Sequence, residues 1–128
     1  MFSHVMVGSN DVERSKTFYD AVFAAIGAKP GRADDKGVNY AHKGALLMVR
    51  PPLDGQAATH ANGATIGLII DSPEQVDAWH AAGVSAGGTA VEDPPGIRQG
   101  TFGPLYLAYL RDPDGNKLCA LYRYPVER

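Results

Sequence analysis

The sequence predicts an α+β domain made of two copies of one unit, each a strand, a helix and three further strands. The first observation is an internal repeat: an offset of 61 residues (71 − 10) sets Asn10 on Asp71 and His4 on Thr65. The second is that helical periodicity is followed by short alternating runs in both copies. The third is a strong hairpin signal near the end of the chain, at residues 112–116.

Each predicted helix has a recognisable start and one apolar face. Residues 11–26 place apolar side chains at helical spacing, and Asn10 or Asp11 is suited to cap the first turn. The second helix is expected over residues 72–82, with Ser72 as its cap and a proline in its first turn. Both helices can therefore pack one face against a sheet.

Short strand-like runs precede and follow each helix. They are expected at residues 4–10, 28–32, 38–42 and 45–50, and again at 65–71, 89–92, 105–111 and 117–123. We expect residues 95–98 and 101–103, which are rich in proline and glycine, to form a flexible flap. The chain reads as one domain over residues 1–128, with module one at about 1–52, a linker at about 53–62 and module two at about 63–128.

Composition and charge exclude several classes of function. The net charge is −2 without a run of Lys or Arg, so binding to nucleic acid or to an anionic membrane has no electrostatic basis. No apolar run approaches the ~18 residues of a membrane helix, and the start of the chain lacks a signal-peptide pattern. Cys119 is the single cysteine and cannot form an internal disulfide, so we expect a reducing, cytoplasmic location.

Two segments resemble the signatures of a known superfamily. His4 in a first strand, followed by NDVERSKTFY at residues 10–19, resembles the opening of the vicinal-oxygen-chelate superfamily; RDPDGNKL at residues 111–118 resembles its closing hairpin. The superfamily includes glyoxalase I, bleomycin- and fosfomycin-resistance proteins and extradiol dioxygenases. The resemblance covers essentially the whole chain. It implies two pseudo-symmetric βαβββ modules in a half-open barrel with a central cavity, and a homodimer.

In the metal-dependent members, four inward-facing side chains hold a divalent cation. The resemblance sets these positions at His4, Met48, Thr65 and Cys119. Only His4 is an ordinary ligand, because a thioether and a hydroxyl bind hard or borderline cations poorly. A shift of one residue in either direction brings in no better donor at the other three positions. We therefore expect no metal and no cofactor, with a divalent metal at an atypical site as the alternative.

His4 and Cys119 are also the candidate catalytic residues. His4 is either a polar cavity residue or a group that exchanges a proton near neutral pH. Cys119 is either a small buried apolar residue or a nucleophile, and a nucleophile would need a cationic neighbour. Acid–base catalysis by these two residues with a nearby tyrosine is a third and weaker option. We expect His60, in the linker, to be exposed.

The remaining candidates describe an apolar and aromatic pocket with one or two cations. Strand alternation directs Met48, Arg50 and Leu121 inward, and tyrosine rings add to the lining. Arg50 or Arg98 would meet a carboxylate or phosphate. The predicted ligand-binding residues are His4, Tyr40, Met48, Arg50, Thr65, Arg98, Phe102, Tyr106, Cys119 and Leu121.

Two functions from different classes fit these residues. One is a metal-free protein that binds a small aromatic or amphiphilic molecule, as the antibiotic-resistance members of the superfamily do. The other is a metal-dependent lyase, isomerase or dioxygenase of the glyoxalase type with an atypical metal site. The shortage of metal ligands favours binding, but it does not exclude catalysis, because family membership alone does not define a reaction.

Overall fold

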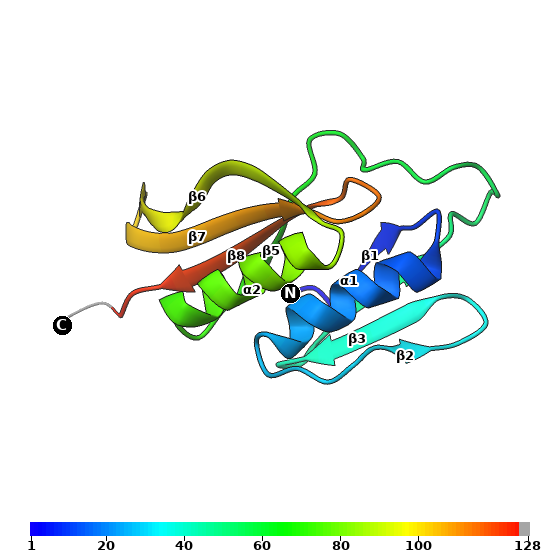
Figure 1. Cartoon of the computed structure of the whole chain (residues 1–128), viewed down its shortest axis with the longest axis horizontal. Helices are drawn as coiled ribbons and strands as arrows, with labels where there is room; N and C mark the ends of the chain where they lie inside the picture. Colours follow the sequence, from blue (N-terminus) through cyan, green and yellow to red (C-terminus); the bar gives the residue numbers. More distant parts are fainter. Residues whose placement is uncertain (126–128) are drawn as a thin grey trace.

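The computed structural model describes residues 1–125, which form two four-stranded mixed sheets and two helices (Figure 1). This confirms the predicted α+β fold of two βαβββ modules. The sheets are not closed into a barrel, which is consistent with the half-open arrangement expected. Residues 126–128, at the end of the predicted second module, lie outside the described part.

Module one begins with a strand whose hydrogen-bonded neighbour is the last strand of the same module. Its elements are β1 (His4–Gly8), α1 (Val12–Ala24), β2 (Arg32–Ala33), β3 (Val38–His42) and β4 (Ala45–Arg50). The strand order is β1-β4-β3-β2, with β1 parallel to β4 and the other pairs antiparallel. Asp11 caps α1, since its carboxylate accepts the backbone N–H of Arg14.

Module two repeats this arrangement. Its elements are β5 (Ile66–Ile69), α2 (Pro73–Ser85), β6 (Thr89–Gly100), β7 (Gly103–Arg111) and β8 (Lys117–Arg123). The order β5-β8-β7-β6 matches that of module one, and β5 is parallel to β8. The predicted cap of α2 is confirmed, because the hydroxyl of Ser72 accepts the backbone N–H of Gln75. The internal repeat is therefore a repeat of topology.

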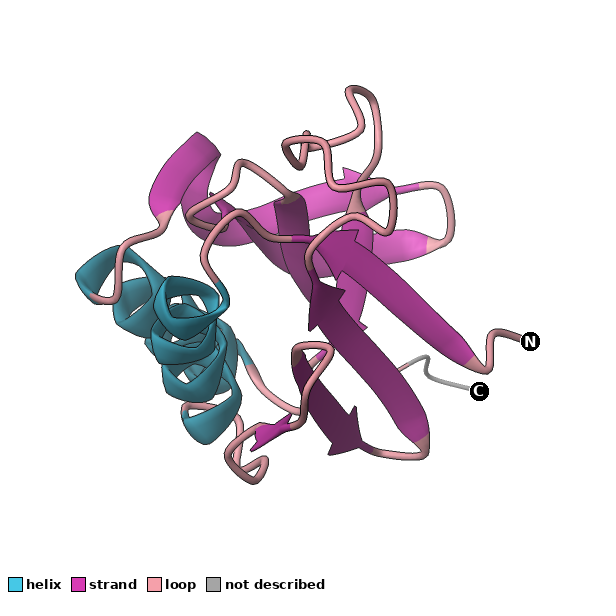
Figure 2. Cartoon of the chain, turned by 90° about the vertical axis from the view of Figure 1, so that its right-hand side faces the viewer, coloured by secondary structure: helices cyan, strands magenta, loops and turns pink. Residues whose placement is uncertain are grey.

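Both helices lie on one side of the molecule and the strands lie on the other (Figure 2). The helices contact each other, and one hydrophobic core runs through both modules. Its largest fully buried side chains are Phe18 and Tyr19 from α1, Trp79 from α2, and Leu110 and Leu118 from the second sheet. The two modules therefore fold as one body, with one face of each sheet covered by helix.

Three sequence expectations differ from the structure. Residues 28–32 contribute only the first residue of β2, and β5 spans Ile66–Ile69, although the backbone N–H of Ile70 still donates to Leu121 of β8. Residues 95–98 belong to β6 and are not a loop; β6 pairs with β7 as far as Gly100. The prolines and glycines of this segment accompany a bulge between Val91 and Gly96, which interrupts the strand pattern without ending the strand.

Neither helix among residues 1–125 has the length and apolar character needed to cross a membrane.

Candidate functional site

The face of the first sheet that points away from the helices carries several of the predicted site residues. Register places His4 beside Leu46 and Met6 beside Met48, and strand alternation turns these side chains to the same face. Val7 and Val49 point to the helix-covered face, where both are buried. We call this uncovered surface the open face of module one; it carries His4, Met6, Asn39, Leu46, Met48 and Arg50.

The second sheet has an equivalent open face, with a more enclosed centre. It carries Gly67, Ile69, Leu107, Tyr109, Cys119 and Leu121. Leu107 is 8% exposed and Cys119 is 6% exposed, although α2 lies against the opposite face of their strands. Neighbouring side chains of the sheet therefore shield this centre from water.

The four positions that correspond to metal ligands do not form a metal site. His4 and Thr65 are exposed, and the Nδ1 atom of His4 lies 2.8 Å from the hydroxyl of Ser3. Met48 is half-buried and supplies a thioether, which suits neither Zn²⁺ nor Mg²⁺. Within residues 1–125, no group of three or more His, Cys, Asp or Glu side chains could hold a metal ion. The donor set therefore does not fit a divalent cation.

The thiol of Cys119 lies in surroundings that keep it protonated. Burial raises its pKa, while the hydroxyl of Tyr109 acts in the opposite direction and the carboxylate of Glu92 raises the pKa further. The ammonium of Lys117 lies 5.0 Å from the centre of the Tyr109 ring and is ion-paired with Glu92. A reactive cysteine needs a lowered pKa, so this environment favours the inert interpretation of Cys119.

The two predicted arginines differ in the hydrogen bonds of their guanidinium groups. One guanidinium nitrogen of Arg98 donates to the backbone oxygens of Asp93 and Pro94, each at 3.0 Å, and so supports the bulge of β6. Arg50 is half-buried, and its Nε atom has no hydrogen-bond partner among the described residues; the same holds for Oδ1 of Asn39 on the same open face. A bound polar group at this margin would satisfy both atoms.

Three aromatic residues lie away from the open faces. Tyr40 is 3% exposed and stacks on Phe23 of α1, with ring centres 4.8 Å apart. The hydroxyl of Tyr106 donates to Asp77 of α2. Phe102 is 85% exposed in the turn between β6 and β7. Alternation along β3 and β7 turns Tyr40 and Tyr106 toward the helices, so neither ring lies on an open face, and their role in ligand binding stays a prediction.

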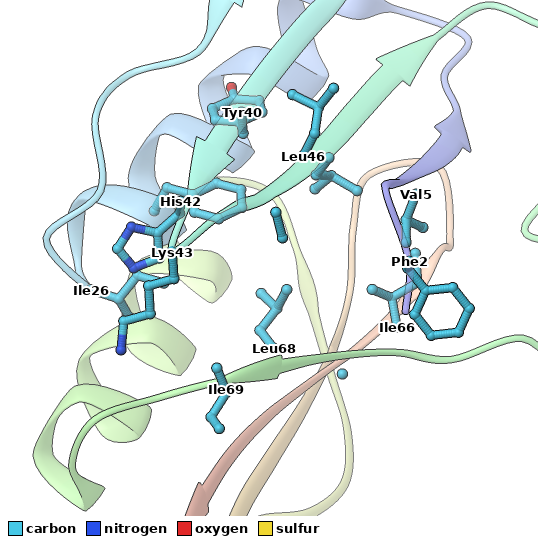
Figure 3. A pocket seen from close by; sticks show the side chains of 14 residues that line it. Phe2, Val5, Ile26, Tyr40, His42, Lys43, Leu46, Ile66, Leu68 and Ile69 are labelled. Carbon is cyan, nitrogen blue, oxygen red and sulfur yellow. The ribbon is translucent and has the colours of Figure 1, made fainter.

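A cavity that the sequence did not suggest lies between the modules (Figure 3). It has a volume of about 230 Å³ and is bounded by β5, the hairpin of β3 and β4, and the end of α1. Its lining includes Tyr40, Leu46 and Leu68, with His42 and Lys43 at one side. Only the repeat offset could have indicated it, because it forms where the first strand of one module meets the hairpin of the other.

The comparison with protein families agrees with this geometry. The Glyoxalase/Bleomycin resistance protein/Dioxygenase superfamily matches residues 1–120. The chain belongs to this superfamily. No curated protein matches the chain.

Solved structures support the same assignment. A glyoxalase/bleomycin resistance protein from Albidiferax ferrireducens T118 is 56% identical, with a TM-score of 0.93 over 96% of this chain and 99% of that one. A glyoxalase-related enzyme from Fulvimarina pelagi is 20% identical, with a TM-score of 0.74 over 99% and 92%. Lactoylglutathione lyase from Agrobacterium tumefaciens is 17% identical, with a TM-score of 0.66 over 95% and 92%. The last two share the fold of this superfamily member.

Proposed function

We propose that this member of the superfamily is a small-molecule-binding protein that works without a resident metal. The observation that supports the proposal most strongly is the donor set at the four ligand positions: one imidazole, one thioether, one hydroxyl and one thiol whose pKa is raised. An imidazole with three such partners holds Zn²⁺ or Fe²⁺ poorly against water and buffer. A binding function needs none of these donors to act as a ligand.

The proposed binding surface is formed by the two open faces. Met48 and Leu121 would contact an apolar or aromatic body, and His4 would supply a hydrogen bond. Arg50 and Arg98 at the margin would favour a ligand with one anionic group. An amphiphilic compound of this kind fits both the apolar centre and the cationic margin.

The proposal includes a homodimer. Met6 on β1 is 58% exposed and Ile69 on β5 is 64% exposed, and both strands are edges of their sheets. A second copy would remove these apolar side chains from water and cover an edge. Sedimentation should therefore give about twice 13.6 kDa. A monomer at high protein concentration would contradict this part.

The proposal also includes a cytoplasmic location. Cys119 as a free thiol agrees with it.

Elemental analysis of the purified protein tests the metal-free proposal. We expect metal well below one ion per chain after dialysis against a chelator, with His4→Ala indistinguishable from the unsubstituted protein. Leu46→Ala, on the same open face, is the matched control for general loosening of the sheet. One metal per chain that resists the chelator and is lost in His4→Ala would replace the proposal with the metal-dependent lyase, isomerase or dioxygenase.

A thermal-shift screen tests ligand binding. A true ligand at about 100 times its Kd should add about 2.7 kcal/mol to the free energy of unfolding. We expect amphiphilic anions with an aromatic body to raise the Tm equally with and without chelator. Leu121→Asp should reduce the effect. Stabilisation that appears only when a divalent metal is added would contradict metal-free binding.

A further inference from the structure

Two cavities between the modules are related by the internal repeat. One is lined by Ile66–Ile69 of β5, and the other by Val5–Gly8 of β1; these segments lie 61 residues apart (66 − 5), which is the repeat offset. Each cavity has a volume of about 230 Å³. Val5 and Ile66 line both cavities, so they lie between the two cavities, where the two modules meet; we call this boundary the seam.

The two cavities differ in what borders them. The linker lines the cavity beside β1, through Thr59 and His60; Asn116 of the loop before β8 and Lys117, the first residue of β8, add polar groups. The cavity beside β5 has no linker residue in its lining. Phe2, which lies near Val5 and Ile66 in Figure 3, lines this cavity and is itself 78% exposed.

The lining of the cavity beside β5 is almost wholly apolar. Phe23, Ile26 and Leu47, which belong to the hydrophobic core, line one side of it. Leu68 projects into it from β5 (Figure 3). Lys43 is the charged residue of the lining, and it is already ion-paired with Asp71. The imidazole of His42 has two ring nitrogens, one donor and one acceptor in its neutral form, that can hydrogen-bond a ligand. An ionic ligand would lose hydration here without an unpaired partner, whereas a neutral ligand would not.

We propose that this cavity binds an uncharged, single-ring apolar molecule that carries at most one hydrogen-bonding group. Its volume supports this size, because an apolar cavity of about 150 Å³ already accommodates benzene. The hydrogen-bonding group of the ligand lies toward His42, and its ring lies against Leu47 and Leu68. The site goes beyond the proposed open-face function. Its rim includes Leu46, Gly67 and Ile69 of the open faces, but its wall is formed by Phe23, Ile26 and Leu47 of the helix-covered side of module one.

The experiment compares two probes of similar shape, p-cresol and benzoate, by amide chemical shifts of the full chain at neutral pH. Saturable shifts with p-cresol should be confined to β5 and residues 42–47. Benzoate should bind at least about tenfold more weakly, because its carboxylate would lose hydration against an apolar lining whose charged residue, Lys43, is already ion-paired with Asp71. Shifts centred on β1 and the linker, on the open faces, or nowhere would overturn the proposal, as would equal binding of the two probes.

Two substitutions at opposite ends of the seam sharpen this test. Leu68→Trp fills the cavity and should weaken p-cresol binding by about tenfold or more. Thr59→Trp places the same side chain beside the other cavity, outside both open faces, and should leave the Kd unchanged. Equal weakening by both would overturn the proposal. If Leu68→Trp does not fold, the chemical-shift map of the unsubstituted chain decides alone.

Dilution of the protein without probe is a further control. Chemical-shift changes at the same residues upon dilution would show that a second copy fills the cavity, and this result would also overturn the proposal.

Discussion

The loop between β7 and β8 contacts the start of α1, and the turn between β3 and β4 contacts the start of α2. The contacted residues, Asn10 and Asp71, are equivalent in the repeat. The two junctions therefore occupy the same place in the pseudo-symmetric fold. They differ in burial and in the number of hydrogen bonds, and this difference shows which part of the sequence holds the modules together.

The junction at α1 is formed by two buried carboxylates. The side chain of Asp114 is fully buried and accepts the backbone N–H of Asn10, the guanidinium of Arg14 and the hydroxyl of Ser15. A carboxylate at this place also interacts favourably with the helix dipole. Asp112 accepts the hydroxyl of Tyr19 at 2.6 Å.

Asp112 also organises its own loop. Its Oδ1 atom accepts the backbone N–H groups of Asp114 and Asn116, each at 2.9 Å. The side-chain amide of Asn116 in turn donates to the backbone oxygen of Gly8 in module one. The DPDGN segment therefore fixes the loop and joins it to module one at the same time.

The junction at α2 is an ion pair between Lys43 and Asp71, whose side chains are 39% and 59% exposed. Exposed pairs of this kind contribute little to stability. Lys43, with a positive φ of 51°, and Gly44 form the whole turn between β3 and β4, which is therefore tight. One short turn and one longer, hydrogen-bonded loop thus give the modules unequal attachments.

The largest expected effect is at the centre of the buried junction. Asp112→Ala leaves the hydroxyl of Tyr19 and the amides of the loop without an acceptor, so we expect a loss of roughly 3–5 kcal/mol in the free energy of unfolding. Urea unfolding measures it. Asp112→Asn is the matched control and should lose less, because one oxygen acceptor remains. A loss below about 1 kcal/mol would remove the distinction between the junctions.

Asp114→Ala should come second. It removes the acceptor of Asn10, Arg14 and Ser15 while leaving the loop bonds of Asp112 in place, and we expect a loss of roughly 2–3 kcal/mol. Urea unfolding at low and high salt checks the assignment. Because the carboxylate is buried, the loss should change little with salt. A strong salt dependence would mean that this contact is a surface ion pair.

The third prediction concerns alkaline pH. Burial, and then the carboxylate of Asp112, raise the pKa of Tyr19 well above its ordinary value. A pKa raised in the folded state gives stability that is complete below the unfolded pKa of about 10 and is lost as the pH rises above it. Tyr19→Phe should cost roughly 1.5–3 kcal/mol at about pH 8.

The same substitution has a distinctive pH signature. The stability difference between Tyr19→Phe and the unsubstituted chain should narrow between about pH 8 and about pH 10.5, because only the latter must keep this hydroxyl protonated. Tyr40 also has a raised pKa, owing to burial and to Asp20, and it contributes equally to both proteins. A difference that stays constant with pH would contradict the raised pKa of the buried Tyr19 hydroxyl.

The smallest effect is expected at the exposed junction. Lys43→Ala should change the free energy of unfolding by at most about 1 kcal/mol, and high salt should abolish the difference. Urea unfolding in parallel with Asp114→Ala gives the comparison directly. A loss as large as that of Asp114→Ala would show that the two junctions attach the modules equally.

The sequence predicted most helices and strands of both modules well, but it predicted less well where loops and site residues lie in the fold. Periodicity and caps located both helices, and the strands at residues 38–42, 45–50 and 117–123 match β3, β4 and β8. The flap at residues 95–98 was wrong, because a bulge lets a strand continue through prolines and glycine. The ligand role of the ten predicted site residues stays a prediction.

The amino-acid sequence by itself determined the duplication, the family and the poor set of metal donors at His4, Met48, Thr65 and Cys119, because these depend on residue types at fixed spacings. Tertiary structure alone decided that Tyr40 and Tyr106 point to the helices, that DPDGN joins the modules, and that a cavity opens beside β5. These features depend on contacts between segments far apart in the chain, such as Tyr19 with Asp112, which local periodicity does not encode.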